Sequence, residues 1–221
     1  MNSEIRLEHQ NPDKALQLAT NFDFLIKKCA FSSFSNSGNG GCVSISNANT
    51  IFIEESTFNG STSSIDGGGI YATGLKLIVC FCVFSEDSAR VGFGLSAYCT
   101  DLNTISNNVF VKCRGTNTEL SDGAWISRYG WTVSELNNGS QITCRGRGAC
   151  FVSGSGLCSH EVKFDMYTSN DAVWVFGLAC LVNESEQCIS NVCLANNTAK
   201  ESVYLWYGNF RVKNSIFSDS I

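Results

Sequence analysis

Residues 53–58 read IEESTF, and residues 26–31, one period earlier, read IKKCAF. Both stretches have a β-branched residue, a small or polar residue three positions later, and an aromatic residue two positions after that. The pattern returns as VCFCVF at 79–84, ISNNVF at 105–110, VKFDMY at 162–167 and VKNSIF at 212–217, with looser copies at 133–138 and 189–194. Successive copies start 23 to 29 residues apart, which predicts a repeat architecture with a period of about 27 residues.

A second motif follows the first in step, 11 to 20 residues later. Its copies are centred on Cys42, Ile70, Leu95, Trp125, Cys150, Val173 and Val203. Both motifs are short and alternate or run apolar, which is typical of strands. Two motifs per period predict two strands per coil, with room for a third, and coils stacked about 4.8 Å apart. We therefore predict an all-β, right-handed parallel β-helix of about eight coils, whose handedness follows the general preference of parallel crossovers.

The third residue after each start of the first motif is almost always small and polar. This column contains Cys29, Ser56, Cys82, Asn108, Asp165 and Ser215. Stacked at a bend, such side chains can bond one another or the backbone along the axis. The pairs Gly40-Gly41 and Gly68-Gly69, before the second motif, are expected to form sharp corners.

The ends of the chain differ from the repeats. We predict that residues 1–23 form an N-terminal cap and residues 24–221 the β-helix. Asn11-Pro12 followed by DKALQLAT predicts an N-cap, a proline at the first helical position and a short helix with Leu16 and Leu18 on one side. The C-terminal NSIFSDSI stops in mid-coil without a capping element, which indicates a truncated chain or an edge for assembly.

Composition and charge limit the classes of partner, whereas they favour two different cellular compartments. The net charge is −5 with no basic run, so we expect no nucleic-acid partner. The sequence contains no run of 18 apolar residues, so it predicts no transmembrane helix. The acidic N-terminus does not resemble a signal peptide, which favours the cytoplasm. Four N-glycosylation sequons and 12 cysteines favour a secreted or surface protein instead. The sequons begin at Asn59, Asn138, Asn183 and Asn196.

The cysteines do not follow a metal-binding or redox pattern, because the chain contains no C-x-x-C. Cys29 and Cys82 share one predicted column and Cys42 and Cys150 another, so we interpret cysteine here as a small buried hydrophobe. Free thiols are favoured over disulfides. We predict no metal site and no cofactor, since the acidic residues are also dispersed at one or two per coil.

An aromatic stripe on the second strand is the most prominent candidate site. If the second-motif column points inward, the residues that follow it point outward. The outward stripe then includes Tyr71, Phe151, Trp174 and Tyr204, flanked by Tyr98, Phe176 and Trp206. Such a row suits stacking on sugars or docking of a protein, because aromatic side chains with a polar tip favour surfaces that are partly apolar and partly in contact with water. The alternative is that a long turn, at residues 113–123 or 134–149, covers the stripe.

Two segments carry a family resemblance: FSNSGNGGCV at 34–43 and FNGSTSSIDGGGIYA at 58–72. They resemble the repeat of the polymorphic outer membrane proteins, and the chain as a whole is similar to the pectin-lyase-like β-helix superfamily. The first family implies an adhesin or antigen at a cell surface, with glycans or a partner protein as ligands. Its motif is a folding repeat, so it implies no catalytic residue.

The pectin-lyase-like superfamily also includes polysaccharide lyases and hydrolases, which keeps an enzyme as an alternative. Resemblance to the hydrolases would require paired aspartates, a G-H-G and an R-x-K, and only Arg211-Val212-Lys213 matches the last of these. Our first hypothesis is therefore a non-catalytic binding protein with no catalytic residues. An enzyme acting on polysaccharide and an intracellular or truncated scaffold remain alternatives.

Overall fold

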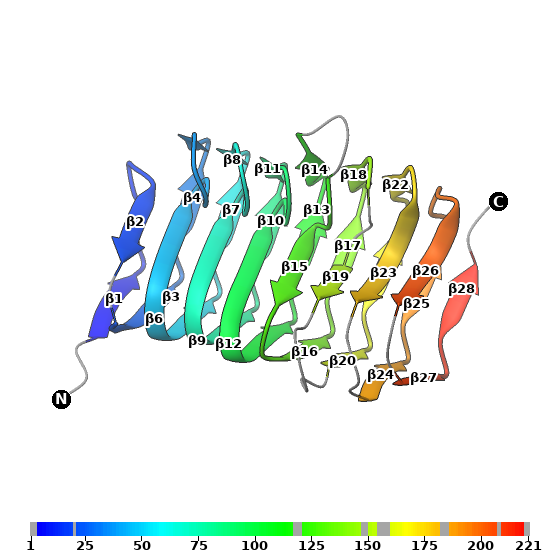
Figure 1. The fold of residues 1–221 in the computed structure, drawn as a ribbon. Helices are drawn as coiled ribbons and strands as arrows, with labels where there is room; N and C mark the ends of the chain where they lie inside the picture. The colour runs from blue at the N-terminus through cyan, green and yellow to red at the C-terminus, as the bar shows by residue number, and fades with distance from the viewer. Residues whose placement is uncertain are drawn as a thin grey trace.

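The computed structural model describes residues 4–19, 21–116, 121–146, 150–153, 160–181, 186–206 and 209–218. Throughout these ranges the regular structure is strand, without a helix. The strands stack in parallel as a β-solenoid of about six turns, whose axis runs from the N-terminal to the C-terminal end of the chain (Figure 1). The predicted all-β fold, parallel stacking and period of about 27 residues are confirmed. No helix that could cross a membrane occurs in the described ranges.

The largest sheet forms two faces of the solenoid that meet at a bend. Its 14 strands are β1 (Glu4–Glu8), β2 (Leu16–Ala19), β3 (Asp23–Lys27), β6 (Val43–Glu54), β9 (Ile70–Cys80), β12 (Leu95–Ser106), β15 (Trp125–Arg128), β16 (Trp131–Glu135), β19 (Cys150–Ser153), β20 (His160–Lys163), β23 (Val175–Leu181), β24 (Glu186–Ser190), β26 (Glu201–Trp206) and β27 (Asn209–Lys213). In three turns one long strand, β6, β9 or β12, runs round the bend, whereas the next turn divides it into β15 and β16 (Figure 1).

Two smaller sheets complete each turn. The eight-stranded sheet contains β4 (Ala30–Ser32), β7 (Thr57–Asn59), β10 (Val83–Ser85), β13 (Val109–Val111), β17 (Asn138–Ser140), β21 (Met166–Thr168), β25 (Cys193–Ala195) and β28 (Ile216–Ser218). The six-stranded sheet contains β5 (Ser35–Asn36), β8 (Thr62–Ser63), β11 (Ser88–Ala89), β14 (Arg114–Gly115), β18 (Thr143–Cys144) and β22 (Asp171–Ala172). The eight copies of the first motif thus match eight strands, but six described turns carry all three sheets, so about six turns replace the predicted eight.

The chain turns its corners with left-handed residues at repeated positions. The corner between the largest and the eight-stranded sheet has positive φ at Lys28, Glu55, Phe81, Asn107, Leu136, Phe164, Asn191 and Asn214. The corner before the largest sheet uses Gly40, Gly67, Gly92 and Gly123. Glycine is needed at this second corner because the chain passes close to the next strand: a Cβ on Gly40 would lie 2.3 Å from the Val43 carbonyl oxygen. The prediction of glycine corners is confirmed, with Gly67 rather than Gly68 in the left-handed region.

An aromatic stack fills the interior beneath the eight-stranded sheet. The rings of Phe31, Phe58, Phe84 and Phe110 are nearly parallel, with centroids 5.1, 5.0 and 4.7 Å apart. These are the aromatic residues that end the first motif. The stack stops at Gly139, where a Cβ would lie 2.4 Å from the Tyr167 ring, so the absence of a side chain makes room for that ring.

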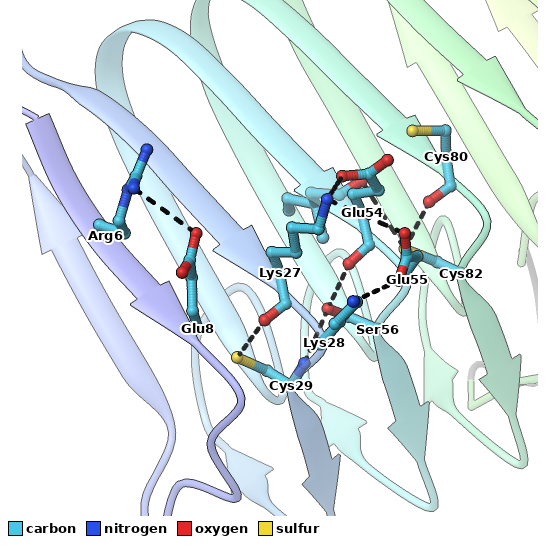
Figure 2. Close-up of polar contacts among 11 residues, drawn as sticks. Arg6, Glu8, Lys27, Lys28, Cys29, Glu54, Glu55, Ser56, Cys80 and Cys82 are labelled. Atoms are coloured by element: carbon cyan, nitrogen blue, oxygen red, sulfur yellow. Dashed lines mark hydrogen bonds and ion pairs between the residues drawn. The ribbon is translucent and has the colours of Figure 1, made fainter.

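The predicted polar column forms a hydrogen-bonded ladder, in which a side chain accepts a bond from the backbone N–H one turn earlier. Ser56 Oγ accepts from Cys29 N at 3.1 Å, and Asn108 Oδ1 accepts from Cys82 N at 2.9 Å. Figure 2 shows the start of this ladder beside the ion pairs Lys27–Glu54 and Lys28–Glu55. The ladder satisfies N–H groups that the corner removes from the sheet.

A second ladder lies at the next bend. Asp87 Oδ1 accepts from Ser61 N at 2.9 Å, and Asn170 Oδ1 accepts from Ile142 N at 2.8 Å. Burial raises the pKa of Asp87 well above its usual range. The two ladders account for buried Ser, Asn and Asp side chains in structural terms.

The predicted N-terminal helix is wrong. Leu16–Ala19 forms β2, which pairs with Val43–Ser46 of β6, and β1 already pairs with β3. Leu16 and Leu18 are two residues apart, which suits the alternation of a strand better than the 3.6-residue period of a helix. The neighbouring edge of β6 supplies the hydrogen bonds that favour the strand.

Three register predictions also need correction. In the first-motif column Ser134, not Val133, pairs with Ile105. In the second-motif column Val43 replaces Cys42 beside Ile70. Further along, Leu178 replaces Val173, because Cys150 pairs with Leu178. Apolar runs such as residues 173–181 fit more than one register, and the hydrogen bonds between turns decide between them.

Candidate functional site

Three tyrosines gather on the outer surface of the largest sheet, beside its bend. The rings of Tyr71 and Tyr98 have centroids 5.4 Å apart, and those of Tyr98 and Tyr129 are 6.3 Å apart. Tyr71 lies on β9 and Tyr98 on β12, and Tyr129 directly follows β15; these are neighbouring strands of successive turns. Tyr71, Tyr98 and Tyr129 are called the tyrosine cluster below. Tyr98 lies at its centre.

Charged groups hold the central ring in place. The Tyr98 hydroxyl donates to Asp66 Oδ2 at 2.7 Å, and Asp66 Oδ1 lies 3.5 Å from Arg90 Nη2. The Arg128 guanidinium lies 5.5 Å from the centre of the Tyr98 ring, a cation–π distance. Burial and the nearby Asp66 carboxylate raise the pKa of Tyr98, so its hydroxyl stays a donor at any physiological pH. Burial and the same carboxylate raise the pKa of Tyr71.

A hollow of about 480 Å³ opens beside Tyr98 along the bend. Its lining contains Asn21, Asn47, Ala48, Asn49, Thr73, Gly74, Leu75, Tyr98 and Thr100. The bend is tight because Gly74 packs directly on the previous turn, where a Cβ would lie 2.2 Å from the Ala48 carbonyl oxygen. The described lining therefore offers one aromatic ring, several amides and hydroxyls, and no charged side chain.

The polar lining is partly bonded to itself. Asn47 N donates to Thr73 Oγ1 at 3.1 Å, and Asn49 Nδ2 donates to the Asn21 carbonyl oxygen. Asn47 has φ 60°, a left-handed conformation that asparagine tolerates. Within the described ranges its side-chain amide makes no hydrogen bond, so it can serve a ligand.

The structure brings together Tyr71 and Tyr98 of the predicted stripe and leaves Trp174 apart. Trp174 is half exposed in the bend before β23, because the true register places Leu178 where Val173 was predicted. The stripe is also interrupted between the two tyrosines and Trp174, because Ser96 and Ile126, which share its strand position, are fully buried. The side chains of Phe151, Phe176, Tyr204 and Trp206 lie outside the part that the structure describes.

The glycine corners explain the interruption. The turn at Gly92 lies directly over Ser96, whose hydroxyl donates to the Val91 carbonyl oxygen at 3.1 Å. In the next turn a Cβ on Gly123 would lie 2.9 Å from the Ile126 side chain. The tight glycine corners therefore cover this part of the outward face, whereas the predicted cover by a long turn at residues 113–123 or 134–149 stays a prediction.

Three of the predicted glycosylation sites can be located. Asn59 and Asn196 are exposed, and Asn138 is half buried. The Asn59 side chain accepts a hydrogen bond from Ser85 Oγ at 2.7 Å. Asn183 lies outside the described residues. All four stay predictions.

The described residues contain no group of three or more His, Cys, Asp and Glu side chains placed to hold a metal ion. Among the cysteines whose side chains the structure describes, nine are free thiols, and seven of these are buried. Burial raises the pKa of Cys82 and of Cys99 to about 12, so these thiols are poor nucleophiles. Arg211 and Lys213 lie on β27 on either side of Val212.

Several residues of the site were not predicted: Asp66, Arg128, Tyr129 and Asn47. Arg128 follows from the correct register, because it continues the strand pairing from Ser127, the partner of Ala97, and therefore stands beside Tyr98. Asp66 lies in the corner between β8 and β9, and Asn47 lies where β6 bends, so neither belongs to the alternation that predicted the stripe.

Comparison with known proteins yields no relative: no family model matches the chain, and no curated protein or solved structure matches it. The fold and the site together define a parallel β-solenoid with a tyrosine cluster and a polar hollow on one bend.

Proposed function

We propose that this solenoid is a non-catalytic binding protein, which recognises a carbohydrate through the tyrosine cluster. The observation that supports this most strongly is the position of Tyr98, which both joins the cluster and lines the polar hollow. A pyranose ring has an apolar face of C–H groups and a rim of hydroxyls. An aromatic ring beside amides and hydroxyls complements both.

The resemblance of residues 34–43 and 58–72 to repeats of polymorphic outer membrane proteins supports adhesion at a cell surface. The second of these segments contains Asp66 and Tyr71, which surround Tyr98. A surface location is therefore part of the proposal. The same face would meet a glycan on another cell or on a partner protein.

A glycan array tests this function. Wild-type protein is expected to bind at least one glycan, and Tyr98→Ala is expected to reduce that signal at least about tenfold, the effect of losing one good stacking contact. Trp174→Ala is the matched control, because Trp174 is a half-exposed aromatic outside the cluster and its loss should leave binding unchanged. Both variants need wild-type circular dichroism before comparison. No binding on the array, or equal loss in both variants, would contradict the proposal.

A further inference from the structure

The hollow beside Tyr98 is elongated along the solenoid axis. Its lining residues come from four successive turns, at Asn21, at 47–49, at 73–75 and at 98–100. Ala48 pairs with Gly74 and Gly74 with Cys99, so these segments lie on neighbouring strands. Neighbouring strands are about 4.8 Å apart, so the three steps span about 14 Å. This is the length of a short chain rather than of a single sugar.

The chemistry of the lining excludes one class of glycan. Among the described residues that line the hollow there is no lysine, arginine, aspartate or glutamate. The two arginines nearest the tyrosine cluster are engaged, Arg90 with Asp66 and Arg128 with the Tyr98 ring. The chain as a whole carries a net charge of −5, which repels polyanions. A uronic-acid or sulfated chain would place charge here without a partner, at a cost in free energy.

The polar groups that remain suit uncharged hydroxyls. Amides donate and accept, and threonine hydroxyls do both, so Asn47, Asn49 and Thr100 can each bond a sugar hydroxyl in either direction. Thr100 is exposed, and its hydroxyl makes one long bond, 3.5 Å to the Gly74 carbonyl oxygen. Leu75 is 46% exposed and offers an apolar contact between the polar ones.

We infer that the hollow is a subsite for a linear, uncharged oligosaccharide of about three units, which lies along the solenoid axis with one end stacked on Tyr98. The inference rests on the proposed carbohydrate-binding function and adds the class, length and direction of the ligand. Successive sugars would contact successive turns of the solenoid. After Tyr98, the order of contacts would be residues 73–75, then 47–49, then Asn21.

Titration calorimetry with defined oligosaccharides tests the inference. The probes are linear oligomers of glucose, galactose, mannose and N-acetylglucosamine, one to six units long, with oligogalacturonides of the same lengths as the charged set. A neutral series is expected to bind, with affinity rising to about three units and then levelling, while the charged set does not. Tyr98→Ala should reduce affinity at least about tenfold, as on the array.

Two variants probe the hollow without disturbing the fold. Asn47→Gly removes the amide and keeps the left-handed conformation, and Thr100→Val removes the hydroxyl and keeps a β-branched strand residue. Both are expected to weaken the binding of trimers about three- to tenfold, as expected for a lost hydrogen bond. Asn47→Gly should leave single sugars unaffected, whereas Thr100→Val, in the same turn as Tyr98, should weaken single sugars as well. Thr62→Val is the matched control, because Thr62 lines a separate hollow with Lys112 and Arg114.

The outcomes separate this inference from the proposed function. Three results would overturn the inference and leave the proposed function standing. In the first, binding depends on Tyr98 but is unchanged in Asn47→Gly and Thr100→Val. In the second, one sugar unit binds as tightly as three. In the third, binding depends on Tyr98 but oligogalacturonides bind in preference to neutral chains. If no oligomer and no arrayed glycan binds, the proposed function fails and the inference fails with it.

Discussion

Two ionisable residues inside the solenoid respond to burial in opposite ways. Asp165 is fully buried in the first ladder, where its Oδ1 accepts from Asn137 N at 2.8 Å and its Oδ2 accepts from the Ser134 and Tyr167 hydroxyls. Burial outweighs these bonds and raises its pKa to about 7. His160 is buried in β20, and burial lowers its pKa to about 4. Each shift makes the stability depend on pH.

Replacing Asp165 with asparagine should raise the stability more at pH 8 than at pH 4. The native state holds the Asp165 proton more tightly than the unfolded state, so its contribution is complete below about pH 4 and is lost as the pH rises towards 7. Asparagine does not titrate, and Asn108 and Asn137 already occupy this ladder position in the two preceding turns. The difference in unfolding free energy between Asp165→Asn and wild type should increase by at most about 4 kcal/mol, measured by denaturant titration at both pH values. A difference independent of pH would show that Asp165 is ionised throughout.

Replacing His160 with glutamine should have the opposite pH dependence. The unfolded state takes up the histidine proton near pH 6.5 and the native state near pH 4, so wild type loses stability as the pH falls through this range. Glutamine is already buried at the same position one turn later, as Gln187, the strand partner of His160. His160→Gln is expected to gain on wild type by at most about 3 kcal/mol between pH 7 and pH 4. Denaturant titrations of both proteins at pH 7 and pH 4 measure this difference in unfolding free energy. If the difference increased as the pH was raised, the lowered pKa of His160 would be contradicted.

At the level of elements, the first corner separates two phenylalanines with different roles. Phe84 is fully buried in the aromatic stack, between Phe58 and Phe110. Phe81, three residues earlier, has φ 56° and is 57% exposed. A bulky side chain in the left-handed region is strained, whereas asparagine tolerates it and is found at this corner in other turns.

Phe84→Ala is expected to cost about 3–5 kcal/mol of unfolding free energy, because it opens a cavity between two stacked rings. Phe81→Asn is the matched control and is expected to leave the stability unchanged or to raise it by up to about 1 kcal/mol. Thermal or denaturant unfolding of both variants provides the measurement. Similar losses in the two would mean that Phe81 makes a contact essential to the corner.

The strands were predictable from the sequence to the extent that their spacing was regular. The first motif correctly placed Phe31, Phe58, Phe84 and Phe110 at one repeated position, where the structure stacks their rings, because the distance from strand to corner to strand is the same in these copies. The second motif begins after a turn of variable length, so its register slipped at Cys42 and at Val173. The segment around Leu16 failed for another reason, since an isolated stretch with a helix-start signal became a strand where a sheet edge was available.

At the scale of the molecule, the candidate site could be only half predicted. Tyr71 and Tyr98 follow from alternation along one strand. Asp66 and Asn47 reach Tyr98 or its hollow because separate turns bring distant segments to one bend. A repeat predicts which residues share a strand position, whereas it does not predict where the loops between strands cross the outer face.

The interior also changes along the axis, which should make stability uneven. One inward column is apolar at Phe24, Ile51 and Leu77 and polar in the following turns. The polar members are Asn103, Thr132, His160 and Gln187. Each turn contacts mainly its two neighbours. The reduced apolar burial in the polar turns therefore lowers the stability of those turns and not that of the whole solenoid. Less apolar burial means weaker local stabilisation.

Hydrogen exchange followed by mass spectrometry should therefore find the slowest amides in β6 and β9 and faster exchange in β16 and β20. Opening of the polar turns exposes less apolar surface and so requires less free energy than opening of the turns around Leu77. His160→Leu is expected to slow exchange in β16, β20 and β24, by replacing a buried imidazole with an apolar side chain, and to leave β6 and β9 unchanged. Equal protection throughout would show that the solenoid opens only as one cooperative unit, with the polar turns as firmly held as the apolar ones.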